Sequence, residues 1–264
     1  MLFLALVIDI TLGEPPNLIH PVAWMGKSIS YLEKKGVGQS HLTQFIYGTV
    51  MTLFLVGLFT AAVFFILFYV KNLNMIAYVI IGSIFLKSTF SLKGLRKVAL
   101  LVKSALMKDN LDEARYEIRS LVSRDSHDLS KPLLVSAAVE SVAESSCDSF
   151  IAPLFYFLLF GVPGAVAYRM VNTIDSMVGY HGKYEFLGKF SSQLDDILNY
   201  IPARLSALLL VLASTFSGRG AQASWQVALN EHYKTESPNA GWTIAAVAGA
   251  LNIQLEKVGQ YKIG

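Results

Sequence analysis

The stretch FIYGTVMTLFLVGLFTAAVFFILFYV, residues 45–70, contains no charged residue. At about 1.5 Å rise per residue a helix over this stretch reaches about 39 Å, more than the ~30 Å hydrocarbon core of a bilayer. Residues 75–92 form a second apolar stretch, interrupted by Lys87, and residues 150–168 form a third, uncharged until Arg169. The chain therefore has several segments that could cross a membrane.

The composition of the whole chain agrees with this interpretation. Of the 264 residues, 53% are hydrophobic and 16% are charged, whereas an average soluble domain carries about 25% charged residues. The net charge of +3 gives no electrostatic footprint for nucleic acid, and the single cysteine, Cys147, cannot form an intrachain disulfide. Because lipid tolerates only helices and closed barrels, and barrel alternation is absent, we expect an all-α polytopic membrane protein forming one domain over 1–264.

The shorter apolar segments complete the expected helices. Residues 1–12 predict a retained helix rather than a cleaved signal peptide, since a basic leading region and a small-residue cleavage site are missing. Residues 205–216 and 242–255 are short for a membrane span. No sheet of consequence is expected.

Lys and Arg gather in residues 93–131 and, more sparsely, in residues 13–44. If 45–70 and 75–92 form a helical hairpin, both basic stretches lie on one side of the cell membrane, which the positive-inside rule makes the cytoplasmic side. We expect a multi-pass protein whose active site faces the cytoplasm.

Residues 93–131 predict surface helices. Asp109 or Asn110 can cap one of them. Apolar residues then recur at helical spacing on one face, which is typical of packing against neighbouring helices; they are Leu111, Ala114, Ile118, Leu121 and Val122.

The segment 150–171 carries Gly161-Val-Pro-Gly164 near its middle. Acidic residues precede and follow this segment, so a single crossing would place them on opposite faces of the membrane. Proline removes a helical hydrogen bond and glycine permits a sharp turn. We therefore predict a broken or re-entrant helix that returns the chain to the cytoplasmic side; the alternative is an ordinary span with a proline kink.

Polar residues next to the apolar segments are the candidates for chemistry, because buried charge is costly and usually functional. The first group, Asp9, Glu14 and His20, surrounds a Gly-Pro-Pro turn and could bind substrate; the alternative is a structural turn with a capping carboxylate. The nearby Gly26-Lys27-Ser28 is not a phosphate-binding P-loop, because the position where that motif needs its first glycine is Pro21.

The second group follows Arg124, a candidate substrate-binding residue. Glu140, Glu144 and Asp148 are spaced i, i+4, i+8 and therefore stack along one helical face without an intervening base. Carboxylates grouped in this way suit Mg²⁺ together with ATP phosphates, so we expect these three to be catalytic and to hold the metal. A solvated acidic face is the alternative.

Three further motifs carry paired acids or phosphate-binding groups. Paired acids suit a cation, Arg suits a phosphate or a carboxylate, and a helix that starts at Ser-Pro could hold a phosphate. A capping or salt-bridge role is the alternative for each motif. A helix carrying Asp195 is expected to end before Pro202. The catalytic candidates here are Asp175, Asp195 and Asp196, and the substrate-binding candidates are Asn172, Asn199, Arg204 and Asn239.

These motifs together resemble the adenosylcobinamide-phosphate synthase family of cobalamin biosynthesis. The matching strings, in the family's order, are DITLGEPPNLIHPVAWMGK (9–27), SRDSHDLSKPLLVSAAVESVAESSCDSFIAPLFY (123–156), YRMVNTIDSMVGY (168–180), LDDILNYIPARL (194–205) and SPNAGW (237–242). The resemblance implies a membrane-bound, ATP-dependent carbon–nitrogen ligase that joins adenosylcobyric acid, a corrinoid, to aminopropanol or its phosphate. Members of the family usually continue past SPNAGW, so we expect this chain, which stops at Gly264, to lack the last helix.

The reaction and the polar groups fit each other. A carboxylate is a poor acyl donor, and phosphorylation by ATP gives an acyl phosphate that an amine can attack. Phosphoryl transfer needs positioning and charge neutralisation by Mg²⁺ and basic side chains. Two other classes of protein stay open at this point: a membrane transporter, which would also carry intramembrane acids, and a non-catalytic membrane relative of the family.

Overall fold

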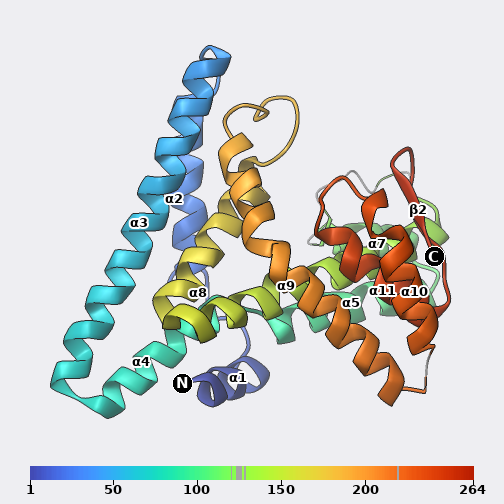
Figure 1. Ribbon diagram of the computed structural model, residues 1–264, viewed down its shortest axis with the longest axis horizontal. Coiled ribbons are helices and arrows are strands. Elements are labelled where there is room, and N and C mark those ends of the chain that lie inside the picture. Colours follow the sequence, from blue (N-terminus) through green and yellow to red (C-terminus); the bar gives the residue numbers. More distant parts are fainter. Residues whose placement is uncertain (120, 123–126, 128, 219) are drawn as a thin grey trace. The chain divides into compact units, whose positions relative to one another are not determined.

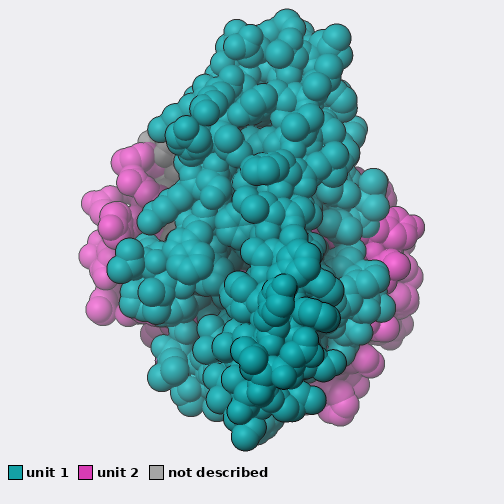
Figure 2. All heavy atoms as spheres, turned by 90° about the vertical axis from the view of Figure 1, so that its left-hand side faces the viewer, with its two compact units in different colours: residues 1–91, 152–198 teal, residues 92–151, 199–264 magenta. Residues whose placement is uncertain are grey.

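The computed structural model describes residues 1–119, 121–122, 127, 129–218 and 220–264. Over these residues the protein is almost entirely helical (Figure 1). The chain forms two compact units, each built from two separate stretches: unit 1 is 1–91 with 152–198, and unit 2 is 92–151 with 199–264 (Figure 2). Because neither unit is a continuous piece of chain, this division does not split the sequence into two domains. The single domain expected over 1–264 stays a prediction.

Unit 1 contains five helices and the first part of a sixth. The long helix α3 packs against α2, α4 and α8, and α1 packs against α4. The side chains of His20, Ser40 and Asn74 accept backbone N–H groups at the first turns of α2, α3 and α4, which explains where these helices begin. The helices are α1 (Leu2–Thr11), α2 (Pro21–Gly36), α3 (His41–Leu73), α4 (Met75–Ser88), α8 (Ala152–Val178) and α9 (Lys189–Phe216), whose later residues belong to unit 2.

The predicted break in the third apolar segment is confirmed. Gly161 within α8 has φ 67° and ψ −163°, a conformation outside the helical region, and Pro163 follows it. A side chain at Gly161 would be strained at this positive φ, and Pro163 has no N–H to donate. The glycine and proline thus interrupt α8 where the sequence placed the interruption.

Unit 2 combines helices with one short hairpin. Strands β1 and β2 pair antiparallel, with Leu255 opposite Ile263, so the expectation of no extensive sheet is confirmed for the described residues. The elements are α5 (Leu92–Met107), α6 (Leu111–Ile118), α7 (Lys131–Ser146), the π-helix η1 (Cys147–Ile151), the later part of α9, α10 (Ala221–Glu231), the 3₁₀ helix η2 (His232–Lys234), α11 (Ala240–Leu251), β1 (Leu255–Lys257) and β2 (Tyr261–Ile263).

The helices predicted in residues 93–131 are present as α5 and α6. That they lie on the membrane surface stays a prediction, since α5 continues a segment long and apolar enough to cross a membrane. Asn110 caps α6, its side-chain oxygen accepting the Glu113 N–H at 3.1 Å. The apolar face packs as expected: Ala114 and Ile118 are fully buried among residues of α5 and α7. The core of this part of unit 2 is therefore built by the stripe visible in the sequence.

Helix α11 begins later than the Ser-Pro signal predicted. Its first residue is Ala240, because Asn239 donates its N–H to the Ser237 hydroxyl at 3.3 Å and residues 237–239 form a turn. The predicted close packing of α11 is confirmed: a Cβ on Gly249 would lie 2.6 Å from the carbonyl oxygen of Ala223 in the first turn of α10.

Four helical segments in the described residues are long and apolar enough to cross a membrane: His41–Leu73, Met75–Met107, Lys131–Val178 and Lys189–Phe216. Helices α1 and α11 are apolar but shorter. The chain is thus an all-α polytopic membrane protein. The cytoplasmic orientation stays a prediction.

Candidate functional site

Unit 1 brings the first predicted group together around a lysine. Lys87 in the last turn of α4 places its Nζ 3.1 Å from Asp9 Oδ1 and 2.6 Å from Glu14 Oε1. Asp9 is fully buried and Lys87 is 2% exposed, whereas the Glu14 side chain is 34% exposed. The three groups form one ion cluster that reaches from the interior of unit 1 to its surface.

His20 extends this cluster, and the hydrogen bonds of its two ring nitrogens determine which of them carries the proton. The His20 Nδ1 accepts the Val22 N–H at 3.1 Å, so this nitrogen carries no proton. The other nitrogen, Nε2, lies 2.8 Å from Glu14 Oε2 and donates to it. The tautomer with the proton on Nε2 satisfies both contacts. His20 therefore caps α2 and orients Glu14 at the same time.

The hydrogen bonds around Glu14 change its acidity. Burial by itself raises the pKa of the Glu14 carboxyl, but hydrogen bonds from His20, Lys87 and Ser91 outweigh that effect and lower the pKa to about 2. Glu14 is consequently a carboxylate at any physiological pH.

Lys87 is the member of this ion cluster that the sequence interpretation missed, because in the sequence it only interrupts an apolar run. A lone lysine inside an apolar span is costly unless it is paired. That rule, applied to Lys87, would have pointed to an acidic partner. Asp9, within the short apolar helix at the start of the chain, is that partner.

The second polar group of unit 1 links α8 to α9. Asn172 receives a hydrogen bond from Arg169 Nη1 at 3.3 Å and donates to Asp195 Oδ1 at 3.3 Å. Asn172 and Asp195 are 6% and 8% exposed. Asp175 accepts a hydrogen bond from Ser192 on α9. The amide and the carboxylates predicted from two separate motifs thus lie on facing helices.

Helix α9 does not end before Pro202, contrary to the sequence prediction. The proline lies inside a helix that continues to Phe216. Proline leaves the carbonyl four residues earlier, that of Leu198, without its helical donor. The Tyr156 hydroxyl donates to this carbonyl oxygen at 2.8 Å. A tertiary hydrogen bond therefore makes the proline tolerable within the helix.

In unit 2, Glu140 anchors the C-terminal hairpin. It is 5% exposed, and its two oxygens accept hydrogen bonds from the Ser136 hydroxyl at 2.6 Å and from the Tyr261 hydroxyl at 2.9 Å. The Ser136 hydroxyl oxygen also accepts the backbone N–H of Glu256 at 2.6 Å. The contacts give Glu140 a positioning role, and its catalytic and metal-binding roles stay predictions.

Glu144 and Asp148 lie further along the same part of the chain, in a different environment. Glu144 is exposed and Asp148 is half-buried. Asp148 belongs to the π-helix η1, a rare element that is often found at functional sites. Within this element Cys147 lies with its Sγ 3.9 Å from the Asn199 Oδ1. Of the three stacked acids, these two are therefore less buried than Glu140.

Arg204 lies against one aromatic ring of its own helix, α9, and a second ring near the start of α11. Its guanidinium carbon lies 3.6 Å from the ring centre of Tyr200 and 5.1 Å from that of Trp242. The same guanidinium donates to the Asn239 Oδ1 at 3.3 Å, and the Trp242 ring stacks on His232 at 3.9 Å. A planar cation fixed in this way suits a phosphate or carboxylate.

The comparisons with known proteins agree with these motifs. The family model described as CobD/Cbib protein matches residues 2–264. The chain belongs to the CobD/Cbib family. A protein of Dehalococcoides mccartyi named cobalamin biosynthesis protein CobD is 55% identical over 261 residues, which cover 99% of this chain and 85% of the relative. A probable cobalamin biosynthesis protein CobD of Methanothermobacter thermautotrophicus is 41% identical over 265 residues, 100% of this chain and 86% of the relative. No solved structure matches the chain.

The candidate residues of this CobD/Cbib member fall into two sets. Unit 1 holds Asp9, Glu14, His20, Asn172, Asp175, Asp195 and Asp196, and unit 2 holds Glu140, Glu144, Asp148, Asn199, Arg204 and Asn239. That the acids on either side of the broken helix share one cavity stays a prediction. Arg124 lies outside the described residues.

No cluster of three or more His, Cys, Asp or Glu side chains suited to a metal occurs in the part of the chain that the structure describes. A magnesium ion bound with a nucleotide needs only one or two protein carboxylates, because phosphates and water supply the other ligands. The predicted Mg²⁺ site over Glu140, Glu144 and Asp148 stays a prediction.

Proposed function

We propose that this CobD/Cbib member is an ATP-dependent amide ligase of cobalamin biosynthesis. It joins the carboxylate of adenosylcobyric acid to the amine of aminopropanol or of its phosphate. The observation that carries the proposal is a family match over the whole chain together with polar motifs on membrane helices. Placing carboxylates, an amide and a guanidinium on membrane helices costs free energy, and such residues usually have a function.

The proposed reaction has two steps. A carboxylate oxygen of the corrinoid attacks the γ-phosphorus of ATP, the bond from this phosphorus to its bridging oxygen breaks, and ADP leaves. The amine nitrogen then attacks the acyl carbon, gives up its proton to a base, and inorganic phosphate leaves with the electrons of the carbon–oxygen bond. Amide, ADP and phosphate are the products.

Residues of unit 2 suit the first step. Glu144 and Asp148 offer the carboxylate oxygens that Mg²⁺ prefers, and the ion would neutralise phosphate charge. Arg204 offers a pre-oriented guanidinium for a phosphate or for the corrinoid carboxylate, because the rings of Tyr200 and Trp242 restrict its rotamers. Arg204 would stabilise charge that grows during phosphoryl transfer.

Residues of unit 1 suit the second substrate and the proton transfer. Asp175, Asp195 and Asp196 are candidates for the base that takes the amine proton. Asp195 is held by Asn172 at 3.3 Å, and Asn172 is in turn held by Arg169. Asp9 is buried against Lys87, but the cluster of two carboxylates and one ammonium keeps a net negative charge. Glu14, at its exposed end, would attract the ammonium form of the amine before it reacts.

The test uses the full chain in proteoliposomes with adenosylcobyric acid, ATP and Mg²⁺, and each amine in turn. Mass spectrometry should detect the amide together with stoichiometric ADP. Glu144→Gln should lower the turnover about 100-fold or more, as loss of one charge-stabilising group does, while the matched variant Glu113→Gln, on α6, should keep the wild-type rate. Amide formation without ATP, or wild-type turnover by Glu144→Gln, would refute this assignment. If the proteoliposomes move a solute across the membrane and form no amide, the result would favour a transporter.

A further inference from the structure

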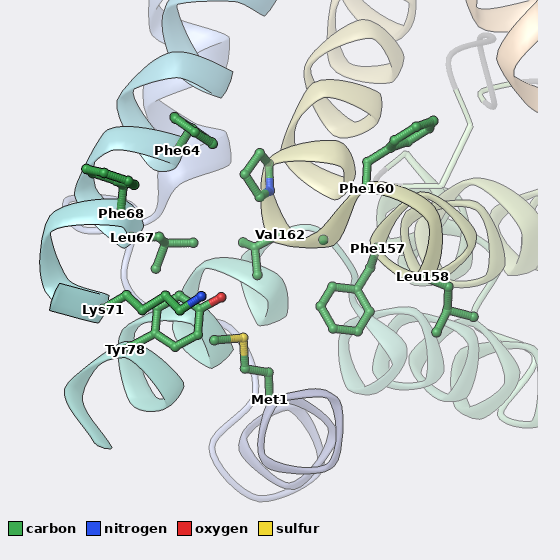
Figure 3. A pocket seen from close by; sticks show the side chains of 12 residues that line it. Met1, Phe64, Leu67, Phe68, Lys71, Tyr78, Phe157, Leu158, Phe160 and Val162 are labelled. Carbon is green, nitrogen blue, oxygen red and sulfur yellow. The ribbon is translucent and has the colours of Figure 1, made fainter. Parts of the chain in front are cut away.

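Unit 1 contains an apolar groove at the break in α8 that none of the candidate catalytic residues lines. Its volume is about 590 Å³, within the ~300–1,000 Å³ typical of small-molecule sites. Residues 161–163 form one end of its wall, so the groove exists because the helix is interrupted there. Helices α3 and α4 form the opposite wall (Figure 3).

The walls of the groove are those of a membrane-facing surface. Phe64 and Phe68 of α3 are 51% and 52% exposed, and Leu158 and Phe160 of α8 are 72% and 66% exposed. These residues lie on segments that are long and apolar enough to cross a membrane. An occupant that reaches this groove from the bilayer needs an apolar body.

One end of the groove is polar and positively charged. Lys71 is in the last turn of α3, and its ammonium lies 5.9 Å from the ring centre of Tyr78 on α4. Figure 3 shows the two side chains next to each other at one side of the groove. None of the carboxylates in the described residues forms an ion pair with Lys71. The groove thus offers a cation and a hydroxyl to an anionic group.

The spacing of these features matches the geometry of a lipid. Lys71 follows the uncharged stretch 45–70, which places it near the membrane–water interface. Phe64 lies seven residues earlier on α3, about 10 Å deeper at ~1.5 Å per residue, within a leaflet about 15 Å thick. A phosphate at Lys71 would therefore leave an acyl chain beside Phe64, Phe68 and Leu158.

We propose that this groove binds one anionic phospholipid of the bilayer. The phosphate group contacts Lys71 and Tyr78, and an acyl chain fills the space between α3 and the interrupted helix α8. The Lys71 ammonium attracts a head group of net negative charge more strongly than a zwitterionic one.

The experiment measures lipids retained by the purified full chain. The protein in detergent is mixed with equal amounts of phosphatidylglycerol and phosphatidylcholine, and native mass spectrometry counts the bound molecules. Wild type should retain one phosphatidylglycerol with about fivefold preference. Lys71→Gln should abolish the preference, whereas Lys183→Gln should keep it. Lys183 is the matched control because it is exposed and also lies over a tyrosine, with its ammonium 4.9 Å from the Tyr184 ring centre.

A second pair of variants tests the acyl-chain site without changing charge. Leu158→Trp places a larger side chain in the groove and should reduce phosphatidylglycerol retention, while Leu159→Trp, 56% exposed and not part of the groove wall, should leave it unchanged. Equal retention of both lipids by wild type would overturn the proposal. So would an undiminished preference in Lys71→Gln, or displacement of the lipid by the corrinoid substrate.

Discussion

Replacing Lys87 with methionine should destabilise the protein more than any other single lysine change of the same kind. Methionine keeps the length and the apolar stem of the side chain but removes the ammonium. Asp9, which is fully buried, then loses the charge that lies 3.1 Å from its Oδ1. Breaking a buried ion pair by removing one partner costs about 3–5 kcal/mol.

The two acids contribute unequally to this loss. Glu14 has a side chain that is 34% exposed, so water solvates it after the change, and its pair with Lys87 contributes about 0–1 kcal/mol as surface pairs do. Nearly all of the expected 3–5 kcal/mol therefore comes from Asp9. Neutralising that acid as well, in Asp9→Asn with Lys87→Met, should recover about 2 kcal/mol, since a buried amide costs less than a buried unpaired charge.

Reversible unfolding of the full chain in mixed detergent micelles measures these free energies. The four proteins of the double-mutant cycle are wild type, Lys87→Met, Asp9→Asn and the double variant. Lys183→Met, a change at an exposed lysine, serves as the control and should stay within about 0.5 kcal/mol of wild type. A loss below about 1 kcal/mol for Lys87→Met, or strictly additive effects, would refute the proposed ion cluster.

Three further outcomes follow from the geometry. The pKa of Glu14 is about 2 in the folded protein, below its ordinary value. Its contribution to stability is therefore complete above about pH 4.5 and is lost as the pH falls toward 2. Between these pH values the free energy of unfolding should fall less in Glu14→Gln than in wild type. Tyr261→Phe removes a hydroxyl that donates to buried Glu140 and should cost about 1.5–3 kcal/mol, with faster hydrogen exchange in the C-terminal hairpin; unchanged exchange would contradict the anchoring role. Cysteines introduced at positions 126 and 180 should both label from the cytoplasmic side if the broken helix is re-entrant, and labelling from opposite sides would exclude the shared cavity.

The broken helix α8 and the capped helix α6 illustrate how far local sequence reasoning reaches. A glycine at positive φ followed by a proline interrupts a helix for reasons within a few residues. Asn110 as a cap and the buried stripe through Ala114 and Ile118 likewise depend on local hydrogen bonding and helical period. The prediction that α9 ends before Pro202 was wrong because a side chain distant in sequence supplies the missing hydrogen-bond donor. The Tyr156 hydroxyl donates to the Leu198 carbonyl, which Pro202 leaves without its helical partner.

The candidate site shows the same division. The polar motifs were recognisable because charged and amide side chains interrupt apolar sequence, and such interruptions are costly in a membrane. Which of them meet was not recognisable: Lys87 joins Asp9 and Glu14 from more than seventy residues away, and Glu140 is held by Tyr261 rather than standing free beside Glu144.

Hydrophobic content determined by itself that this chain is a helical membrane protein and that a long apolar helix covers residues 45–70, and the glycine and proline of α8 determined where α8 breaks. These properties follow from the solvation of each residue and from hydrogen bonds within a few positions of the chain. The tertiary structure alone decided the pairing of Lys87, the anchoring of the hairpin by Glu140 and the continuation of α9 through Pro202. Each of these depends on side chains that are remote in sequence, whose packing decides which buried polar groups are satisfied and which charges are neutralised.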